Sequence, residues 1–427
     1  NSQSDLMPGL LYFYEDFALI IKGGFNSDLA IQGLPTFPMW GYGWVFLITE
    51  SRFLIFLAQS IVAVLSVYYL VQYLYLSDDF SERMIKHFMF FVLVSFSWIA
   101  IHFTLVPNSF AISFKILSIV LLLFGLNNLS VKNSIYYIIV SALFFGLVLN
   151  FRPDYIYFTL VILFVIIWFE SSKKGVLYAT LWLFIVALLL APWAIYTYSN
   201  FDKPLLTSTN SGHVLFIGLG QLPGNKWNIT PNDHDPRMWE ELGREMGDDV
   251  HSLSYDGDQY LKNRFVELVL ANPVEYSKKV SYSAIKTLIS GIYVPEFYRL
   301  RSDCEIDCRD EFLMDIRERP VGALFDDAEK FFLYSITYLS IIGGIILLFL
   351  SYIITPFVMI KGLKTKNLLL LLCGLLMIYQ LMINSFAFQM KLYSTNTYLF
   401  GIVLLAYFTA ENKFISNKLS NINLIEK

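Results

Sequence analysis

Residues 176–199 read VLYATLWLFIVALLLAPWAIYTYS, an apolar run that ends where a long polar block begins. A run of this length crosses a hydrocarbon core of about 30 Å as a helix, because a helix satisfies its own backbone hydrogen bonds in lipid. The block that follows, Asn200–Lys330, interrupts a series of similar apolar runs. This layout predicts a polytopic membrane protein with one sizeable domain on one side. It favours an enzyme acting at the membrane surface over a channel or transporter.

The composition agrees with this reading. Hydrophobic residues make up 56% of the chain, charged residues 15%, and the mean hydropathy is +0.55. Soluble domains carry about 25% charged residues. The net charge of −4 is modest and the basic residues are dispersed, which excludes a nucleic-acid-binding surface.

The apolar runs predict an all-α protein with about nine transmembrane helices. Because the chain opens on Asn1 in a polar stretch, an initial outward helix is expected ahead of it, which would raise the number to about ten. The predicted spans are Phe53–Leu76, Lys86–Leu105, Ala111–Asn128, Ser134–Phe151, Tyr155–Phe169, Val176–Ser199, Phe331–Tyr352, Leu368–Phe386 and Tyr393–Ala410.

Lysine and arginine residues fall in alternate loops, which by the positive-inside rule are cytoplasmic. These residues are Arg83, Lys86, Lys132, Lys173, Lys174, Lys361, Lys364, Lys366, Lys413, Lys418 and Lys427. The chain then divides into a first extracytoplasmic loop (1–52), transmembrane helices (53–199), a mostly helical extracytoplasmic domain (200–330), and transmembrane helices with a cytoplasmic tail (331–427). A bacterial cell membrane fits better than the endoplasmic reticulum.

Metal and cysteine chemistry receive little support. Cys373 lies within a predicted span and is interpreted as a packing residue, whereas Cys304 and Cys308 fit a local disulfide on the outer side. The run from Asp233 to Asp235 contains a histidine, but consecutive residues rarely all face one ion. A helix at 258–270 is expected to be amphipathic; its apolar face carries Leu261, Phe265, Leu268 and Val269.

The first outer loop contains the acids Asp5, Glu15 and Asp16, followed by a proline- and aromatic-rich stretch that ends at Tyr42. These acids could serve as a general base or hold a divalent cation. The alternative is that they are ordinary solvated loop acids.

Basic residues at the outer ends of the spans are candidate phosphate ligands. Arg152 and Asp154 flank a proline between two apolar runs, where charge is expensive and is retained for a pair or a ligand. Either a local ion pair closes this turn, or Arg152 binds a lipid-linked phosphate. Lys115 and Lys391 are similar candidates, with snorkelling to the membrane surface as the alternative.

The start of the large block, residues 203–220, is rich in hydroxyl, amide and glycine residues and includes Asn210 and His213. Such residues allow backbone N–H groups to approach an oxyanion or sugar hydroxyls closely. The stretch does not match a Walker phosphate-binding loop, and an ordinary loop is the alternative.

These features, in this order, resemble the GT-C class of membrane glycosyltransferases, closest to the dolichyl-phosphate-mannose protein mannosyltransferase and aminoarabinose transferase branch. The features are the acidic first loop with Gly23-Gly24, Pro35-x-x-Pro38-x-x-Gly41-Tyr42, Arg152-Pro-Asp154, Pro192-Trp-Ala-Ile195, Ser208-Thr-Asn-Ser-Gly212 with Gly218, and Lys391-Leu-Tyr393. The resemblance covers nearly the whole chain.

The resemblance implies inverting transfer of a sugar from a polyprenyl-phosphate carrier to a lipid, glycan or protein acceptor on the non-cytoplasmic side. It assigns the general base to Asp5 first, with Glu15 and Asp16 as substitutes. Arg152 and Lys391 would offset charge on the departing phosphate. No cofactor is implied beyond room for a divalent cation.

The chain departs from the family pattern at three places. The family often has an acid where this chain reads Ser113-Phe-Lys115, Arg-Asn where it has Tyr196-Thr197, and Glu-Arg-Tyr where it has Met390-Lys391-Leu-Tyr393. These departures leave a divergent or inactive member open. The rival functions are a non-catalytic lipid-linked glycan binding or transport protein, and a glycan polymerase or ligase that would use His213 and His102.

Overall fold

The computed structural model describes residues 41, 45, 48–49, 51–95, 98, 102, 107–127, 134–170, 172–233, 235–247, 250–289, 328–389 and 394–412. Within these residues the chain forms thirteen α-helices and one short 3-10 turn, with no strand. The predicted all-α class is therefore confirmed for the described part of the chain.

Six of the described helices are long and apolar enough to cross a membrane, which indicates a multi-pass integral membrane protein. Three of the predicted spans match these candidate spans at both ends: Phe53–Leu76, Ser134–Phe151 and Leu368–Phe386. The six helices are α4 (Arg52–Leu76), α7 (Pro107–Leu126), α8 (Ser134–Phe151), α10 (Ser172–Phe201), α16 (Ala328–Thr365) and α17 (Leu368–Phe386).

Three further predicted spans correspond to shorter helices: α5 (Glu82–Val94), α9 (Phe158–Phe169) and α19 (Tyr398–Glu411). The prediction of one continuous helix over 86–105 is wrong, because α5 ends at Val94. At the next residue, Ser95, the backbone leaves the helical region at φ −88° and ψ 62°. The Ser95 hydroxyl donates to the Phe91 carbonyl and lies 3.3 Å from the Tyr398 hydroxyl.

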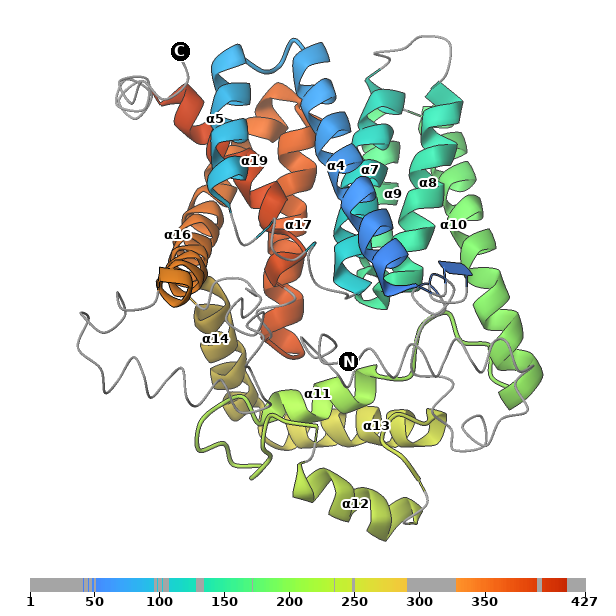
Figure 1. Ribbon diagram of the computed structural model, residues 1–427. Coiled ribbons are helices and arrows are strands. Elements are labelled where there is room, and N and C mark those ends of the chain that lie inside the picture. Colours follow the sequence, from blue (N-terminus) through green and yellow to red (C-terminus); the bar gives the residue numbers. More distant parts are fainter. Residues whose placement is uncertain are drawn as a thin grey trace.

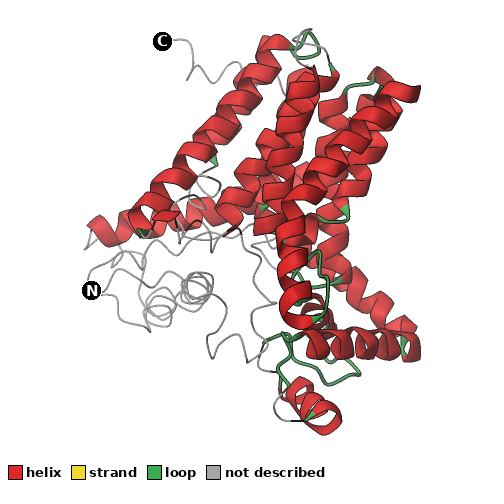
Figure 2. Cartoon of the chain, turned by 90° about the vertical axis from the view of Figure 1, so that its right-hand side faces the viewer, coloured by secondary structure: helices red, strands yellow, loops and turns green. Residues whose placement is uncertain are grey.

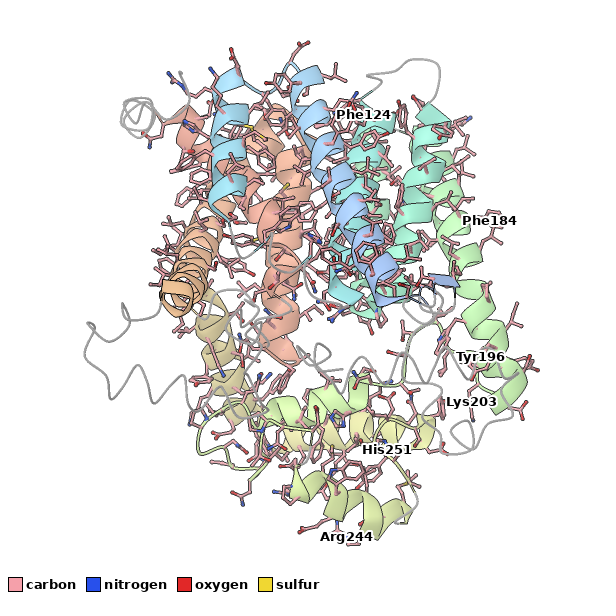
Figure 3. The ribbon with its side chains drawn as sticks, viewed as in Figure 1. Phe124, Phe184, Tyr196, Lys203, Arg244 and His251 are labelled. Atoms are coloured by element: carbon pink, nitrogen blue, oxygen red, sulfur yellow. The ribbon has the colours of Figure 1, made fainter. Side chains whose placement is uncertain are left out.

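The helices form a bundle around α7, whose candidate span is wholly buried. Helix α7 packs on α4 and α8, α10 packs on α8, and α16 and α5 pack on α19 (Figure 1). Figure 2 shows the same bundle from the right-hand side of that view. Apolar side chains on the bundle surface point outward, as Phe184 of α10 does in Figure 3, where it is 58% exposed. This outward apolar surface is the one that a bilayer would cover.

Four helices form a separate layer at one end of the bundle: α11 (Ser211–Leu219), α12 (Pro236–Met246), α13 (Tyr255–Ala271) and α14 (Pro273–Ile289) (Figure 1). We call this layer the helical domain. Its core contains Phe216, Trp227, Met238 and Leu261. The predicted apolar face of α13 is confirmed, because all four of its residues belong to this core or pack against it. The α4–α5 turn and the C-terminal end of α16 lie at the opposite end of the bundle (Figure 1).

Local sequence explains where several of these helices begin. The Asp235 carboxylate accepts a hydrogen bond from the Met238 amide at 2.8 Å, and Pro236 occupies the first position of α12. Asn367 caps α17 by accepting from the Leu370 amide at 3.1 Å. Both caps satisfy amides that have no partner inside the helix.

Candidate functional site

A network of buried and half-buried polar side chains lies at the end of the bundle that faces the helical domain. It comprises Asn108, Lys115, Arg152, Asp154 and Asn396, and we call it the polar cluster. These residues come from α7, from the turn after α8, and from the segment before α19. Buried ionisable groups at membrane depth are costly and usually mark a functional site.

Lys115 is fully buried on α7. Its Nζ donates to the Asn396 carbonyl at 2.5 Å and lies 3.9 Å from the centre of the Tyr155 ring. The snorkelling alternative is therefore excluded, because the ammonium does not reach the surface. The hydrogen bond from Lys115 fixes the position of Asn396.

Arg152 lies at the start of the 3-10 turn Pro153–Tyr155. Its Nε donates to Asp154 Oδ1 at 2.9 Å, and its Nη1 donates to Asn108 Oδ1 at 3.3 Å. The Arg152 side chain is 15% exposed. The local ion pair weighed from the sequence is thus present, and Asn108 holds the same guanidinium from α7.

Asn108 links the two cations through Asn396. Its Nδ2 donates to Asn396 Oδ1 at 2.9 Å, while the Asn396 backbone carbonyl accepts from Lys115. The Asn396 Nδ2 is buried and has no hydrogen-bond partner among the described residues. An unpaired buried donor is costly, so this amide group is suited to a ligand oxygen.

A second chain of buried amides and hydroxyls runs beside the polar cluster. The Tyr155 hydroxyl donates to Gln380 at 2.9 Å, Gln380 donates to Asn384 at 3.0 Å, and Asn384 donates to the Ser394 hydroxyl at 3.1 Å. The sequence analysis missed these residues. The signal that could have found them was Gln380 and Asn384 inside the apolar run 368–386.

His102 is buried near α7. Its Nδ1 lies 2.7 Å from the Ser109 hydroxyl, and its backbone carbonyl accepts from Gln59 at 2.7 Å. Its Nε2 has no hydrogen-bond partner in the part of the chain that the structure describes.

Side chains of the helical domain form hydrogen bonds with residues 385–389 at the end of α17. We call these residues the 385–389 segment. Lys279 of α14 is fully buried, and its Nζ donates to the carbonyls of Ser385, Phe386 and Ala387 at 2.9, 3.2 and 2.6 Å. Gln221 both donates to the Gln389 carbonyl and accepts from its amide, each at 2.9 Å. The domain therefore holds the segment that leads towards Asn396.

His213 of α11 is bonded on both sides. Its Nδ1 lies 3.0 Å from the Ser252 hydroxyl and its Nε2 lies 3.0 Å from Asp233 Oδ1. Ser252 is fully buried whereas the Asp233 side chain is 79% exposed, so the serine cannot act as a nucleophile on an external substrate. Burial, and then the nearby His213, lower the pKa of His251. The His251 ring packs edge-on against Trp239 of α12.

Asn210 precedes α11 without a side-chain capping bond. The neighbouring Gly212 amide donates to Asp258 Oδ1 at 2.6 Å, and Lys262 lies 2.6 Å from the other carboxylate oxygen. The anion bound at the start of α11 is therefore the carboxylate of Asp258 from the same chain. Among the described residues, neither Asn210 nor His213 forms a hydrogen bond or ion pair with the polar cluster.

Several predicted site residues lie outside the described residues: Asp5, Glu15, Asp16, Tyr42 and Lys391, together with Cys304 and Cys308. Among the described residues, no group of three or more metal-ligating side chains is close enough to hold a metal ion. Asp235 instead accepts from the Thr230 amide and hydroxyl at 2.5 and 2.6 Å while capping α12.

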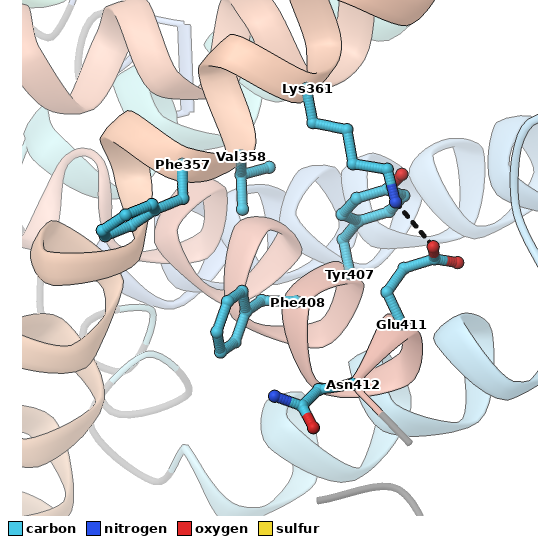
Figure 4. A pocket seen from close by; sticks show the side chains of 7 residues that line it. All are labelled: Phe357, Val358, Lys361, Tyr407, Phe408, Glu411 and Asn412. Atoms are coloured by element: carbon cyan, nitrogen blue, oxygen red, sulfur yellow. Dashed lines mark hydrogen bonds and ion pairs between the residues drawn. The ribbon is translucent and has the colours of Figure 1, made fainter. Parts of the chain in front are cut away.

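A separate hollow of about 280 Å³ lies at the opposite end of the bundle, between α16 and α19 (Figure 4). Apolar side chains line most of it, and the Lys361–Glu411 ion pair at 2.6 Å closes one side. None of the residues that line it belongs to the polar cluster.

Comparisons with protein-family models, curated proteins and solved structures found no match to this chain.

Proposed function

We propose that this protein transfers a sugar from a polyprenyl-phosphate carrier to an acceptor hydroxyl at the end of the bundle that carries the helical domain. The observation that supports this most is the polar cluster, which holds an arginine and a lysine side chain within a membrane bundle. A lipid-linked phosphate presents its charge at this depth while its chain stays in the bilayer. Guanidinium groups match phosphate oxygens well.

The proposed reaction assigns a role to each group. A carboxylate of the first loop, Asp5 in preference to Glu15 or Asp16, takes the proton of the acceptor hydroxyl. The acceptor oxygen attacks the anomeric carbon, the bond from that carbon to the phosphate oxygen breaks, and polyprenyl phosphate leaves. Attack from the face opposite the phosphate inverts the anomeric centre. Arg152 and Lys115 stabilise the negative charge that grows on the phosphate.

A second candidate is a non-catalytic protein that binds or transports a lipid-linked glycan. The observation that favours it concerns Asp154, which is the one carboxylate in the described part of the polar cluster. Arg152 donates a hydrogen bond to this carboxylate, so it is already paired within the cluster. A glycan polymerase or ligase that relies on His102 and His213 has less support, because His213 is bonded at both ring nitrogens.

Sugar transfer by the purified protein distinguishes these candidates. The protein in detergent is given a panel of radiolabelled polyprenyl-phosphate sugars and a mixture of acceptors, and Asp5→Asn and Glu15→Gln are compared with wild type. Transfer that disappears in one variant while the fold is retained would support the enzyme and identify its base. Saturable binding of the donor without transfer, equal in all three proteins, would favour the binding or transport protein.

Asp256→Asn is a suitable control, because it removes an acid of the first turn of α13 in the helical domain. We expect this variant to transfer at the wild-type rate. Loss of transfer in the control as well would indicate that the assay reports general damage and would remove the support for a specific base.

A further inference from the structure

Helix α14 buries a stripe of polar side chains and exposes several large apolar ones. The side chains that it buries recur at every fourth position and are all polar: Glu275, Lys279, Ser283 and Thr287. Its exposed face carries large apolar residues: Val274, Tyr282, Ile285 and Ile289, the last two at 60% and 56% exposure. A helix on the surface of a soluble domain normally buries its apolar side and exposes its polar side.

The buried polar stripe is accounted for by its partners. Lys279 donates to the three carbonyls at the end of α17, and these carbonyls would otherwise have no donor within the helix. The Ser283 hydroxyl lies 3.5 Å from Gln221, and the Thr287 hydroxyl donates to the Ser283 carbonyl at 2.8 Å. The packing of α14 on α17 therefore explains the buried polar stripe. It does not explain why large apolar side chains lie on the outward face.

The second half of α14 runs beside the membrane helices. Lys279 meets α17 at Ser385–Ala387, where the candidate span ends, and Leu288 packs against the core of the bundle. Between Lys279 and Ile289 the helix advances about 15 Å, at about 1.5 Å per residue. In Figure 1, α14 rises from the helical domain towards α16. Its outward face therefore continues the surface of the bundle.

We propose that the outward face of α14 formed by Tyr282, Ile285 and Ile289 is inserted in the lipid leaflet next to the helical domain. The neighbouring surface of α16 is also apolar, with Leu339, Ile342 and Ile346 all at least half exposed, and α14 packs on α16. Lys278 and Lys286 flank this face on the same helix, and a tyrosine lies between them. Lysine and tyrosine are the side chains found where apolar surface meets lipid headgroups.

Lipid is favoured over a second protein because the face is continuous with the lipid-facing surface of a candidate membrane span. The inference does not depend on the proposed transferase activity. It states that the helical domain is fixed to the bilayer by α14 in addition to the six candidate spans. The position of the polar cluster relative to the membrane surface would then be set partly by α14.

A nitroxide spin label at residue 285 tests this directly. The label is attached to Ile285→Cys in protein whose other cysteines are replaced, Cys304 and Cys308 by serine and the buried Cys373 by alanine, and the protein is reconstituted in vesicles of phosphatidylcholine and phosphatidylglycerol. Power saturation compares collisions with oxygen, which concentrates in lipid, and with a water-soluble nickel chelate. Phe357→Cys provides the lipid reference, because Phe357 is 64% exposed on α16. Glu240→Cys, on the exposed side of α12, provides the water reference.

We expect the label at residue 285 to favour oxygen over the nickel chelate by several-fold, as at residue 357 and opposite to residue 240. A label at Ile289→Cys should behave in the same way, which keeps the test valid where one variant fails to fold. Preference for the nickel chelate would show a solvated face and overturn the proposal. Suppression of both collision rates would show that a protein surface covers α14, which also overturns it.

Discussion

Replacing Lys279 by methionine should loosen the contact between the helical domain and the membrane bundle. Methionine keeps most of the side-chain volume but removes the donor that serves three carbonyls at the end of α17. The bond to Ser385 is buried and those to Phe386 and Ala387 are partly buried. Leaving one buried carbonyl without a partner costs about 1 to 3 kcal/mol, and two partly hydrated ones about 0.5 kcal/mol each. We therefore expect a loss of about 2 to 4 kcal/mol.

Hydrogen exchange of individual amides measures this loss where it should occur. The Ala387 amide donates to the Ile383 carbonyl at 3.0 Å and the Gln389 amide donates to Gln221 at 2.9 Å, so both report on the 385–389 segment. A loss of 2 to 4 kcal/mol corresponds to exchange about 30-fold to several hundred-fold faster.

Lys278→Met is the matched control on the same helix, because its side chain is 63% exposed and its contact with Glu275 is 3.4 Å long. Exposed pairs of this kind contribute at most about 1 kcal/mol, so the control should exchange nearly as slowly as wild type. Unchanged exchange in Lys279→Met, or equal acceleration in both variants, would refute the role given to Lys279.

Two further substitutions test the packing and the polar cluster. Gly218→Ala should lower the free energy of unfolding by about 1 to 3 kcal/mol, because a Cβ there would lie 2.2 Å from the Ala387 carbonyl oxygen. Gly343→Ala is the control, because no atom lies within 4 Å of a Cβ added there. It should leave the free energy of unfolding unchanged or raise it by up to about 1 kcal/mol. Equal unfolding midpoints for the two variants would contradict the close contact at Gly218. Lys115→Met should weaken binding of polyprenyl phosphate about tenfold, because Asn396 loses the bond that positions it in the cluster. Its unfolding midpoint should fall less than that of Lys279→Met, because one carbonyl loses its donor instead of three; a large loss of stability with unchanged binding would make Lys115 purely structural.

Long apolar runs made the main spans predictable. Residues 134–151 and 368–386 were located to the residue because they are bounded by polar or turn-forming residues and contain almost nothing charged. The prediction for the run that begins near Lys86 failed, because the helix ends before Ser95, whose hydroxyl contacts the Tyr398 hydroxyl from a distant part of the sequence. Composition carries no information about such a contact.

The candidate site was predicted only in part. Arg152 and Lys115 were recognised because charge is rare in apolar runs, yet their partners Asn108 and Asn396 were not. An asparagine near the end of a span has no distinctive sequence pattern, and Asn108 and Asn396 meet only in the folded protein. The burial of the polar stripe of α14 could not be predicted for the same reason, because it depends on contacts with the end of α17, a distant part of the sequence.

Binding of polyprenyl phosphate in lipid nanodiscs tests the central claim most directly. Wild type, Arg152→Gln and the control Lys86→Gln, at the opposite end of the bundle, are each titrated with radiolabelled polyprenyl phosphate and with polyprenol, which lacks the phosphate. We expect wild type and the control to prefer the phosphorylated lipid at least tenfold, and Arg152→Gln to lose most of that preference, because a charged hydrogen bond is worth about 1.5 to 3 kcal/mol. Equal binding of the two lipids by wild type, or an unchanged preference in Arg152→Gln, would contradict a phosphate site in the polar cluster.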